Sequence, residues 1–252
     1  KGVNRVKKEY LYVLLAYITM HLSSFIGMPI LFFIATKMGY SQTDAQFYAS
    51  AYWGMFSFTV ALVVILLILR KELTFKGAPL RSDAPKASAA LSVFWAIAGI
   101  FLAFFSQSIA GMIEIAIGIE TGSENTQYLV SVISKIPLFI IVTSIIGPIL
   151  EEVVFRKIIF GSLYKRWNYF ISALLSSFIF GIVHFEFEHI ILYTAMGFTF
   201  AFLYAKTQRI LVPIVAHVMM NTTVVIMIVF KDEIEQILRD MEQVQSFIGG
   251  LL

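Results

Sequence analysis

Long apolar runs separated by short polar segments dominate this chain. A membrane-spanning helix needs roughly 20 predominantly apolar residues, and seven segments approach or exceed that length. They are Tyr10–Ala35, Ala45–Leu69, Ala89–Gly118, Pro137–Tyr164, Tyr169–Phe187, His189–Ala205 and Ile210–Phe230. The pattern predicts an all-α protein, a polytopic transmembrane helical bundle of about seven to eight spans.

Two further segments are predicted to be helical but are not among those spans. Tyr128–Ile136 is either a separate short helix or the start of the fourth span, and a break near Pro137 is favoured because the residue before a proline disfavours helical backbone. Lys231–Leu252 repeats apolar residues at helical spacing with acids between them. This tail is predicted to be a C-terminal amphipathic helix on the membrane or on the protein, with a partner-binding helix as the alternative.

Composition supports a membrane location. The 252 residues are 59% hydrophobic and 14% charged, whereas soluble domains are nearer half apolar and a quarter charged. There is no cysteine, which excludes disulfides and thiolate chemistry. The apolar run behind the basic N-terminal segment is too long for a cleavable signal peptide. The lipid bilayer is the expected partner, and no nucleic acid is expected.

Basic residues alternate between the two sets of loops. If there are seven spans, one side receives the basic residues of four segments: the N-terminus, the 70–87 loop, residues 156–166 and residues 206–209. The other side receives only Lys37, Lys135, Lys231 and Arg239. Cytoplasmic loops carry the excess of positive charge, so the chain is predicted to be a multi-pass plasma-membrane protein with a cytoplasmic N-terminus.

Two adjacent acids and an arginine interrupt the fourth apolar run. Charges at bilayer depth are costly, so such residues indicate function by default. Glu152 and Arg156 are four residues apart and can pair on one helix face. Glu151 is turned about 100° away, which would leave it free to face a cavity. Adjacent acids in different surroundings can separate a proton-shuttling carboxylate from a structural one.

Two later spans carry polar residues at helical spacing. Phe180 and His184 share one face of the fifth span, and His217 and Asn221 share one face of the last. Glu151 and His184 each lie about 16 residues, roughly 24 Å, from the turn at 165–168, so an antiparallel hairpin places them level. Together these groups offer the bases and hydrogen-bond donors that amide hydrolysis requires.

Each group alone has a simpler interpretation. A lone histidine such as His184 is commonly a hydrogen-bonded packing residue, Asn221 can join helices, and a Glu–Arg pair can be purely structural. Glu114, His21 and His189 show no partner in the sequence and are interpreted as ordinary structural residues.

The three motifs in order carry a resemblance. Glu-Glu-x-x-x-Arg, Phe-x-x-x-His and His-x-x-x-Asn, within about Pro137 to Phe230, resemble the CPBP family of intramembrane proteases. That family includes the type II CAAX prenyl endopeptidases and bacterial proteins linked to bacteriocin processing and self-immunity. The resemblance implies a catalytic helical core at 137–230. The apolar pattern adds N-terminal transmembrane helices at 1–136, which carry no matching motif, and the amphipathic helix at 231–252.

The resemblance also implies roles for the motif residues. Glu151 and His184 would activate the attacking water, and His217 and Asn221 would stabilise the tetrahedral oxyanion. The remaining motif residues would position the site or pack beneath it: Glu152, Arg156 and Phe180.

The resemblance leaves metal dependence open. If zinc is present, Glu151, His184 and His217 are its expected ligands. There is no His-Glu-x-x-His sequence, and Asn221 is a poor zinc ligand but a good oxyanion donor. The metal-free water mechanism, with no cofactor, is therefore favoured.

The resulting expectation is an intramembrane endopeptidase that cuts a membrane-associated peptide or a lipidated C-terminus near the cytoplasmic half of the bilayer. A prenylated C-terminus and a bacterial peptide precursor both stay open as substrates. The alternatives are a non-catalytic membrane scaffold or regulator with the same fold, and a transporter or channel. The latter usually shows internal repeats, and none is visible in the sequence.

Overall fold

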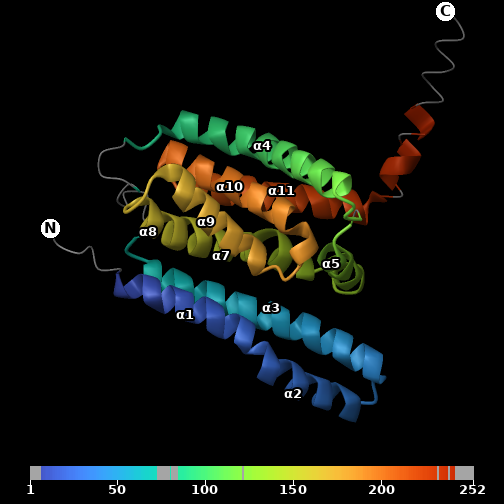
Figure 1. The fold of residues 1–252 in the computed structure, drawn as a ribbon. Helices are drawn as coiled ribbons and strands as arrows, with labels where there is room; N and C mark the ends of the chain where they lie inside the picture. Colours follow the sequence, from blue (N-terminus) through green and yellow to red (C-terminus); the bar gives the residue numbers. More distant parts are fainter. Residues whose placement is uncertain are drawn as a thin grey trace, which may run out of the picture.

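The computed structural model describes residues 7–72, 80, 85–120, 122–231, 233–237 and 239–241, and all regular elements within these ranges are helices (Figure 1). The first three helices are α1 (Lys8–Leu22), α2 (Ser24–Lys37) and α3 (Gln42–Leu69). Only Ser23 separates α1 from α2. The α3 helix packs along both of them, and its start is capped by the Ser41 hydroxyl, which accepts from the backbone N–H of Asp44.

Two helices of different length follow. The α4 helix (Ala89–Ala116) is long and apolar, whereas α5 (Glu124–Lys135) is short and amphipathic. The α5 helix ends at Lys135, and the next residue, Ile136, departs from helical backbone with φ of −133° and ψ of 80°, directly before Pro137. The predicted separate helix and its break are confirmed.

The fourth predicted span is a nearly continuous helical rod containing two π-helical segments. Helical hydrogen bonds between residues five apart are rare in proteins. Where they do occur, they are often found at functional sites. Glu151 ends an α-helical segment, and Glu152 begins the longer π-helical one. In order the rod consists of α6 (Phe139–Ile141), η1 (Val142–Ile146), α7 (Gly147–Glu151), η2 (Glu152–Phe160) and α8 (Gly161–Tyr164).

The last part of the bundle contains α9 (Tyr169–Ile182), the short 3-10 helix η3 (Phe187–His189), α10 (Ile190–Thr207) and α11 (Leu211–Val229). The predicted fifth span, which ran to Phe187, was too long. The α9 helix ends at Ile182 because the chain turns there, and Phe185 takes a left-handed backbone with φ of 58°. His184 therefore lies in a turn just beyond the helix.

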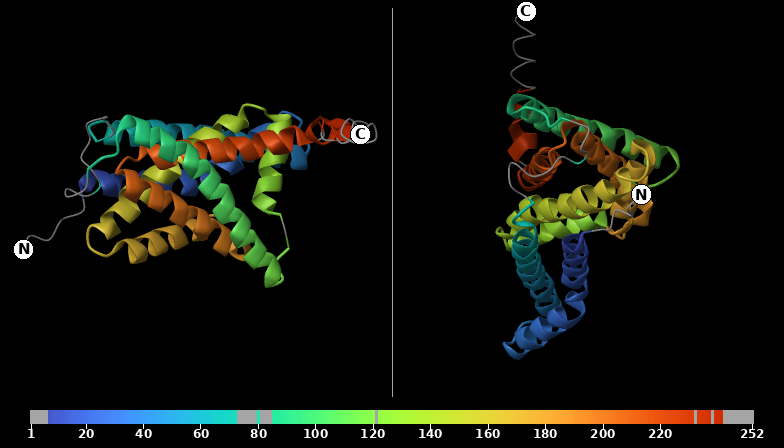
Figure 2. Two further views of the ribbon diagram at one scale, coloured as in Figure 1. Left: turned by 90° about the horizontal axis from the view of Figure 1, so that it is seen from above. Right: turned by 90° about the vertical axis from the view of Figure 1, so that its left-hand side faces the viewer.

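The rod lies inside the bundle. Figures 1 and 2 show α1–α3 as a layer on one side, with α9 and the rod in the middle and α4, α10 and α11 on the other side. Val153, Val154, Phe155 and Ile158 of η2 are buried. Large apolar side chains such as Phe101 of α4 are exposed on the outer helices, as expected for a surface that faces lipid.

Five helices of the described residues are long and apolar enough to cross a membrane. They are Lys8–Lys37, Gln42–Leu69, Ala89–Ala116, Phe187–Thr207 and Leu211–Val229, with Tyr169–Ile182 as a shorter apolar helix. The structure thus supports a polytopic helical membrane protein, while the count of seven to eight spans stays a prediction.

The C-terminal tail is described only in part. Residues 231, 233–237 and 239–241 are helical. The remainder of the predicted amphipathic helix Lys231–Leu252 lies outside the described residues. The division into segments 1–136, 137–230 and 231–252 also stays a prediction.

Candidate active site

The motif residues of three separate segments converge in the interior. Glu151 and Glu152 lie where α7 passes into η2, and His217 of α11 contacts both of them. His184, in the turn after α9, is close enough to Glu151 and His217 for electrostatic interaction. The ring of Phe180 lies 4.6 Å from the His184 ring and 6.2 Å from the His217 ring between centroids, so these segments meet at one place.

Glu152 is the buried member of the acid pair. Its side chain has no exposed surface, and its Oε2 lies 3.2 Å from Nε of Arg156. This i,i+4 ion pair was predicted. Its Oε1 also accepts from Nδ1 of His217 over 3.0 Å, which the sequence did not indicate. Glu152 thus joins η2 to α11 as well as neutralising Arg156.

Arg156 is held between aromatic rings. Its guanidinium carbon lies 4.6 Å from the ring centre of Phe180 and 5.7 Å from that of Phe200. Cation–π attraction grows when the cation is desolvated, and the Arg156 side chain is fully buried. Phe180 therefore contacts both Arg156 and the His184 ring, and Arg156 pairs with Glu152 in an apolar environment.

Glu151 is only partly buried, since one-fifth of its side-chain surface is exposed. Its Oε2 lies 3.7 Å from Nε2 of His217. Rotation between successive residues sends Glu151 and Glu152 to different sides, but His217 is placed to reach both. Tyr17 and His21 of α1 interact electrostatically with Glu151 from the other side.

His184 is oriented by two contacts. The carbonyl oxygen of Phe180 lies 2.7 Å from its Nδ1, and because a carbonyl only accepts, Nδ1 carries the hydrogen. Nε2 is then the nitrogen that can accept a proton. The ring stacks on Tyr193, with centroids 4.0 Å apart and planes 21° apart. These contacts set both the tautomer and the plane of the imidazole.

His217 is placed to act as a donor. Its ring stacks on Phe200 at 4.5 Å, and its two nitrogens face the carboxylates of Glu152 and Glu151. A ring N–H beside a carboxylate forms a charge-assisted hydrogen bond. A His217 ring that carries a hydrogen on Nε2 can donate from that atom.

Asn221 lies one helical turn beyond His217. Its amide Nδ2 donates to the carbonyl of Thr143, in the π segment η1, over 3.3 Å. A primary amide has two N–H bonds, so the second remains for another acceptor. The contact also aligns α11 with the rod that carries both acids.

Zinc was the alternative expected at this site, with Glu151, His184 and His217 as its ligands. Among the residues that the structure describes, no three His, Asp or Glu side chains are grouped so that they could hold a metal ion. Nδ1 of His184 is occupied by the Phe180 carbonyl and Nδ1 of His217 by Glu152. A metal-ligating histidine commonly makes such a contact with its other nitrogen, so the metal-free mechanism stays a prediction.

Sequence reasoning missed several contacts near the site. Glu114 and His189, interpreted as having no partner, are buried and paired, with Oε2 2.9 Å from Nδ1. Tyr193 stacks on His184, and His21 packs edge-on against Tyr17. The available signal was a polar residue within an apolar run, but the partners are far apart in sequence.

These observations define an all-helical membrane protein whose interior gathers acid, imidazole and amide groups from three segments. The profile of a family described as type II CAAX prenyl endopeptidase Rce1-like matches residues 133–223. That range contains all three motifs.

Two relatives extend the match. A Bacillus subtilis (strain 168) protein named as a membrane peptidase, YdiL, is 51% identical over 251 residues, covering 98% of this chain and 99% of the relative. A Staphylococcus aureus (strain USA300) protein named membrane-embedded CAAX protease MroQ is 36% identical over 185 residues, covering 71% and 74%. No solved structure matches significantly. The chain belongs to the type II CAAX prenyl endopeptidase Rce1-like family of membrane proteases.

Proposed function

We propose that this protein is an intramembrane endopeptidase that hydrolyses a peptide bond of a membrane-associated substrate with water as the nucleophile. The observation that carries the proposal is the position of His217 between two carboxylates of unequal exposure. Glu151, the partly exposed acid, can take up and release a proton, whereas Glu152, the buried acid, holds the His217 imidazole. Peptide hydrolysis needs both a group that transfers protons and a fixed hydrogen-bonding group at one place.

Water activation is assigned to Glu151 and His184. The Glu151 carboxylate, one-fifth exposed, takes a proton from the water. His184 accepts a hydrogen bond from the same water at Nε2, because its Nδ1–H is committed to the Phe180 carbonyl. The water oxygen then forms a bond to the scissile carbonyl carbon. General-base assistance of this kind contributes about 10²–10⁴-fold.

Oxyanion stabilisation is assigned to His217 and Asn221. As the carbonyl oxygen becomes negative, the His217 imidazolium and the second N–H of Asn221 donate to it. When the tetrahedral intermediate collapses, the C–N bond breaks and the leaving nitrogen takes the proton from Glu151. The products are a new carboxylate terminus and a new amine terminus, and no cofactor is consumed. Glu152, Arg156 and Phe180 position these groups without touching the substrate.

The proposed substrate is a hydrophobic peptide or a protein with a lipidated C-terminus. The relatives' names favour the CAAX class, in which a C-terminal Cys-a-a-X sequence carries a prenyl group. The exposed apolar side chains of the outer helices fit a substrate that arrives through lipid. We place the protein in the plasma membrane with its N-terminus in the cytoplasm. The N-terminal segment is rich in Lys and Arg, and such segments are expected on the cytoplasmic side.

Comparative peptidomics tests the proposal. Membrane peptides from cells with the wild-type protein are compared with those from cells with Glu151→Ala at equal protein level. The proposal expects one or more uncut precursors in the variant and their products only in the wild type. The purified protein is then tested in liposomes against a synthetic farnesylated Cys-a-a-X peptide and an unlipidated apolar peptide of equal length.

The alternative of a non-catalytic scaffold makes the opposite prediction. A scaffold with this fold leaves the peptide profiles identical, and the Glu151→Ala strain keeps its phenotype.

Chelation separates the metal-free mechanism from a zinc-dependent one. Activity that survives exhaustive removal of divalent metals supports the metal-free route, and activity that is lost and then restored by zinc contradicts it.

A further inference from the structure

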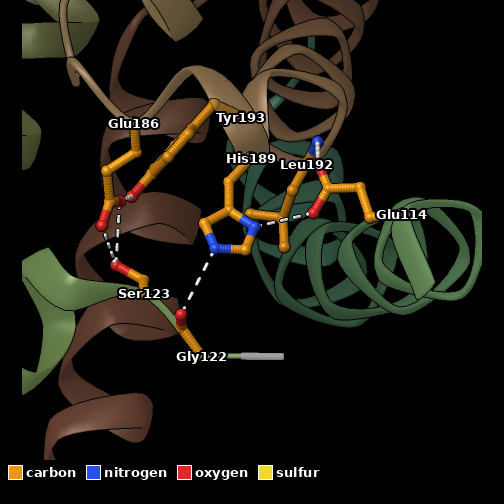
Figure 3. A network of polar contacts seen from close by, with 7 residues as sticks. All are labelled: Glu114, Gly122, Ser123, Glu186, His189, Leu192 and Tyr193. Carbon is orange, nitrogen blue, oxygen red and sulfur yellow. Dashed lines mark hydrogen bonds and ion pairs between the residues drawn. The ribbon is translucent and has the colours of Figure 1, made fainter. Parts of the chain in front are cut away.

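A second polar network surrounds the turn that follows His184 (Figure 3). The carboxylate of Glu186 accepts hydrogen bonds from the Ser123 hydroxyl and from the backbone N–H of Asn125, each at 2.8 Å. It also accepts a short hydrogen bond from the Tyr193 hydroxyl. Glu186 thus joins the start of α5 to the first turns of α10.

Tyr193 connects this network to the catalytic site. Its hydroxyl is held by Glu186, while its ring lies flat against the His184 imidazole, with centroids 4.0 Å apart. Tyr193 is 8% exposed, so neighbours confine the ring. A shift of the hydroxyl must therefore move the surface on which His184 rests.

The turn between them requires such support. Phe185, which separates His184 from Glu186, has φ of 58° and a side chain that is 77% exposed. A left-handed backbone at a bulky residue is strained and persists only when its surroundings fix it. Since Phe185 has little packing of its own, the contacts of the next residue, Glu186, supply that restraint.

Glu186 is suited to a permanent anchor. Burial alone would raise the pKa of its carboxyl, but the hydrogen bonds from Asn125, Tyr193 and Ser123 outweigh burial and hold the pKa below its ordinary value. The carboxylate is therefore ionised at neutral pH. An ionised acceptor forms stronger hydrogen bonds than a neutral one.

We propose that Tyr193 and Glu186 are positioning residues that fix the plane of the His184 imidazole relative to Glu151. This inference rests on the proposed function, because it assigns the two residues a role in peptide hydrolysis. Neither residue takes a proton from the water or touches the scissile bond. Their contribution is to keep Nε2 of His184 directed at the attacking water.

A separate anchor holds the fold at the same place. Glu114 of α4 accepts from the backbone N–H of Leu192 over 2.9 Å and pairs with His189. Nε2 of His189 lies 3.3 Å from the carbonyl of Gly122. These contacts attach the start of α10 to α4 without Glu186 or Tyr193. Loss of the Glu186–Tyr193 bond is therefore expected to change catalysis more than folding.

The test uses Tyr193→Phe, Glu186→Gln and the double variant of the full-length protein in liposomes, with the farnesylated peptide as the probe. Tyr193→Phe keeps the stacked ring and removes only the donor. Small displacements of a catalytic group can cost about 10²-fold, so kcat is expected to fall about 10- to 100-fold with KM unchanged. The kcat of the double variant should be no lower than that of the more impaired single variant, because both changes break the same Glu186–Tyr193 hydrogen bond.

Matched controls separate positioning from folding. Glu188→Gln, an exposed acid two residues along, should keep wild-type kcat, and Tyr193→Leu, which also removes the ring, should lose more than Tyr193→Phe. Tyr193→Phe, Glu186→Gln and Glu188→Gln should unfold near the wild-type temperature. A Tyr193→Phe protein with wild-type kcat overturns the positioning role. So does a Tyr193→Phe protein whose lower kcat is accompanied by a clearly lower unfolding temperature. A wild-type protein that leaves both the farnesylated peptide and the unlipidated apolar peptide intact contradicts the proposed function itself and removes the basis of this inference.

Discussion

His217 Nδ1 lies 3.0 Å from Oε1 of Glu152, and both side chains are buried. Because Arg156 shares the same carboxylate, Glu152 compensates two basic groups in an apolar interior. Removing one member of a buried ion pair costs about 3–5 kcal/mol, since the charge left behind has no partner.

Glu152→Ala is therefore expected to lower the free energy of unfolding by about that amount. Glu152→Gln, which keeps the shape, should fold better but still lose activity. Thermal unfolding in detergent measures the first effect and peptide cleavage the second. Glu235→Gln is the control, because its pairs with Lys231 and Arg239 are exposed and worth little. Equal stability of Glu152→Ala and wild type contradicts the assignment.

Asn221→Ala tests the proposed oxyanion donor. Removal of one such donor typically lowers kcat by about 10²–10³-fold, and KM should change little because the charge develops only in the transition state. Steady-state cleavage of the farnesylated peptide gives both constants. An unchanged kcat removes Asn221 from the oxyanion site and leaves it only its contact with Thr143.

Glu72 ties the start of α1 to the end of η2. Its carboxylate accepts from Lys7 Nζ at 2.6 Å and lies 3.6 Å from Lys157 Nζ. Burial opposes ionisation, but the Lys7 hydrogen bond and the Lys157 charge outweigh it, so the pKa of Glu72 lies below its ordinary value of 4.5. A depressed folded-state pKa stabilises the fold above the unfolded pKa, and this stabilisation is lost as pH falls through the folded value.

The expected signature is a pH-dependent difference between wild type and Glu72→Gln. The wild type should unfold at the higher temperature above pH 4.5, and the two should converge as the solution becomes more acidic. Glu9→Gln, an exposed change of equal charge at the start of α1, should show no such convergence. A constant difference between wild type and Glu72→Gln would mean that the tether does not depend on ionisation.

Two glycines provide a matched pair for helix packing. A Cβ on Gly197 of α10 would lie 2.9 Å from Cβ and 3.1 Å from Cα of Ser177, whereas a Cβ on Gly111 of α4 would meet nothing within 4 Å. Gly197→Ala should destabilise the protein by about 1–3 kcal/mol through overpacking. Gly111→Ala should stabilise it slightly through helix propensity. Unfolding midpoints that rank the other way would contradict the close approach of α9 and α10.

Much of this arrangement follows from local sequence. Apolar run length predicted the long helices, Pro137 marked the break after α5, and four-residue spacing predicted the Glu152–Arg156 pair. These features depend on residues close together in the chain, where helical geometry fixes the relationship.

The remaining contacts depend on how helices rotate and pack. Glu152 and His217 are 65 residues apart, and Glu114 and His189 are 75 apart. Hydropathy places a residue at a depth but does not say which neighbour it faces. The π segments were also missed, since they change the register of a helix without changing its composition.

Water activation by Glu151 and His184 is tested by measuring cleavage of the farnesylated peptide by Glu151→Ala and His184→Ala, each purified in folded form. Both variants should lose at least about 10²-fold in rate, the lower end of what a general base contributes, while Glu188→Gln keeps the wild-type rate. A Glu151→Ala or His184→Ala protein that cuts the peptide as fast as the wild type would contradict the assignment of water activation to these two side chains.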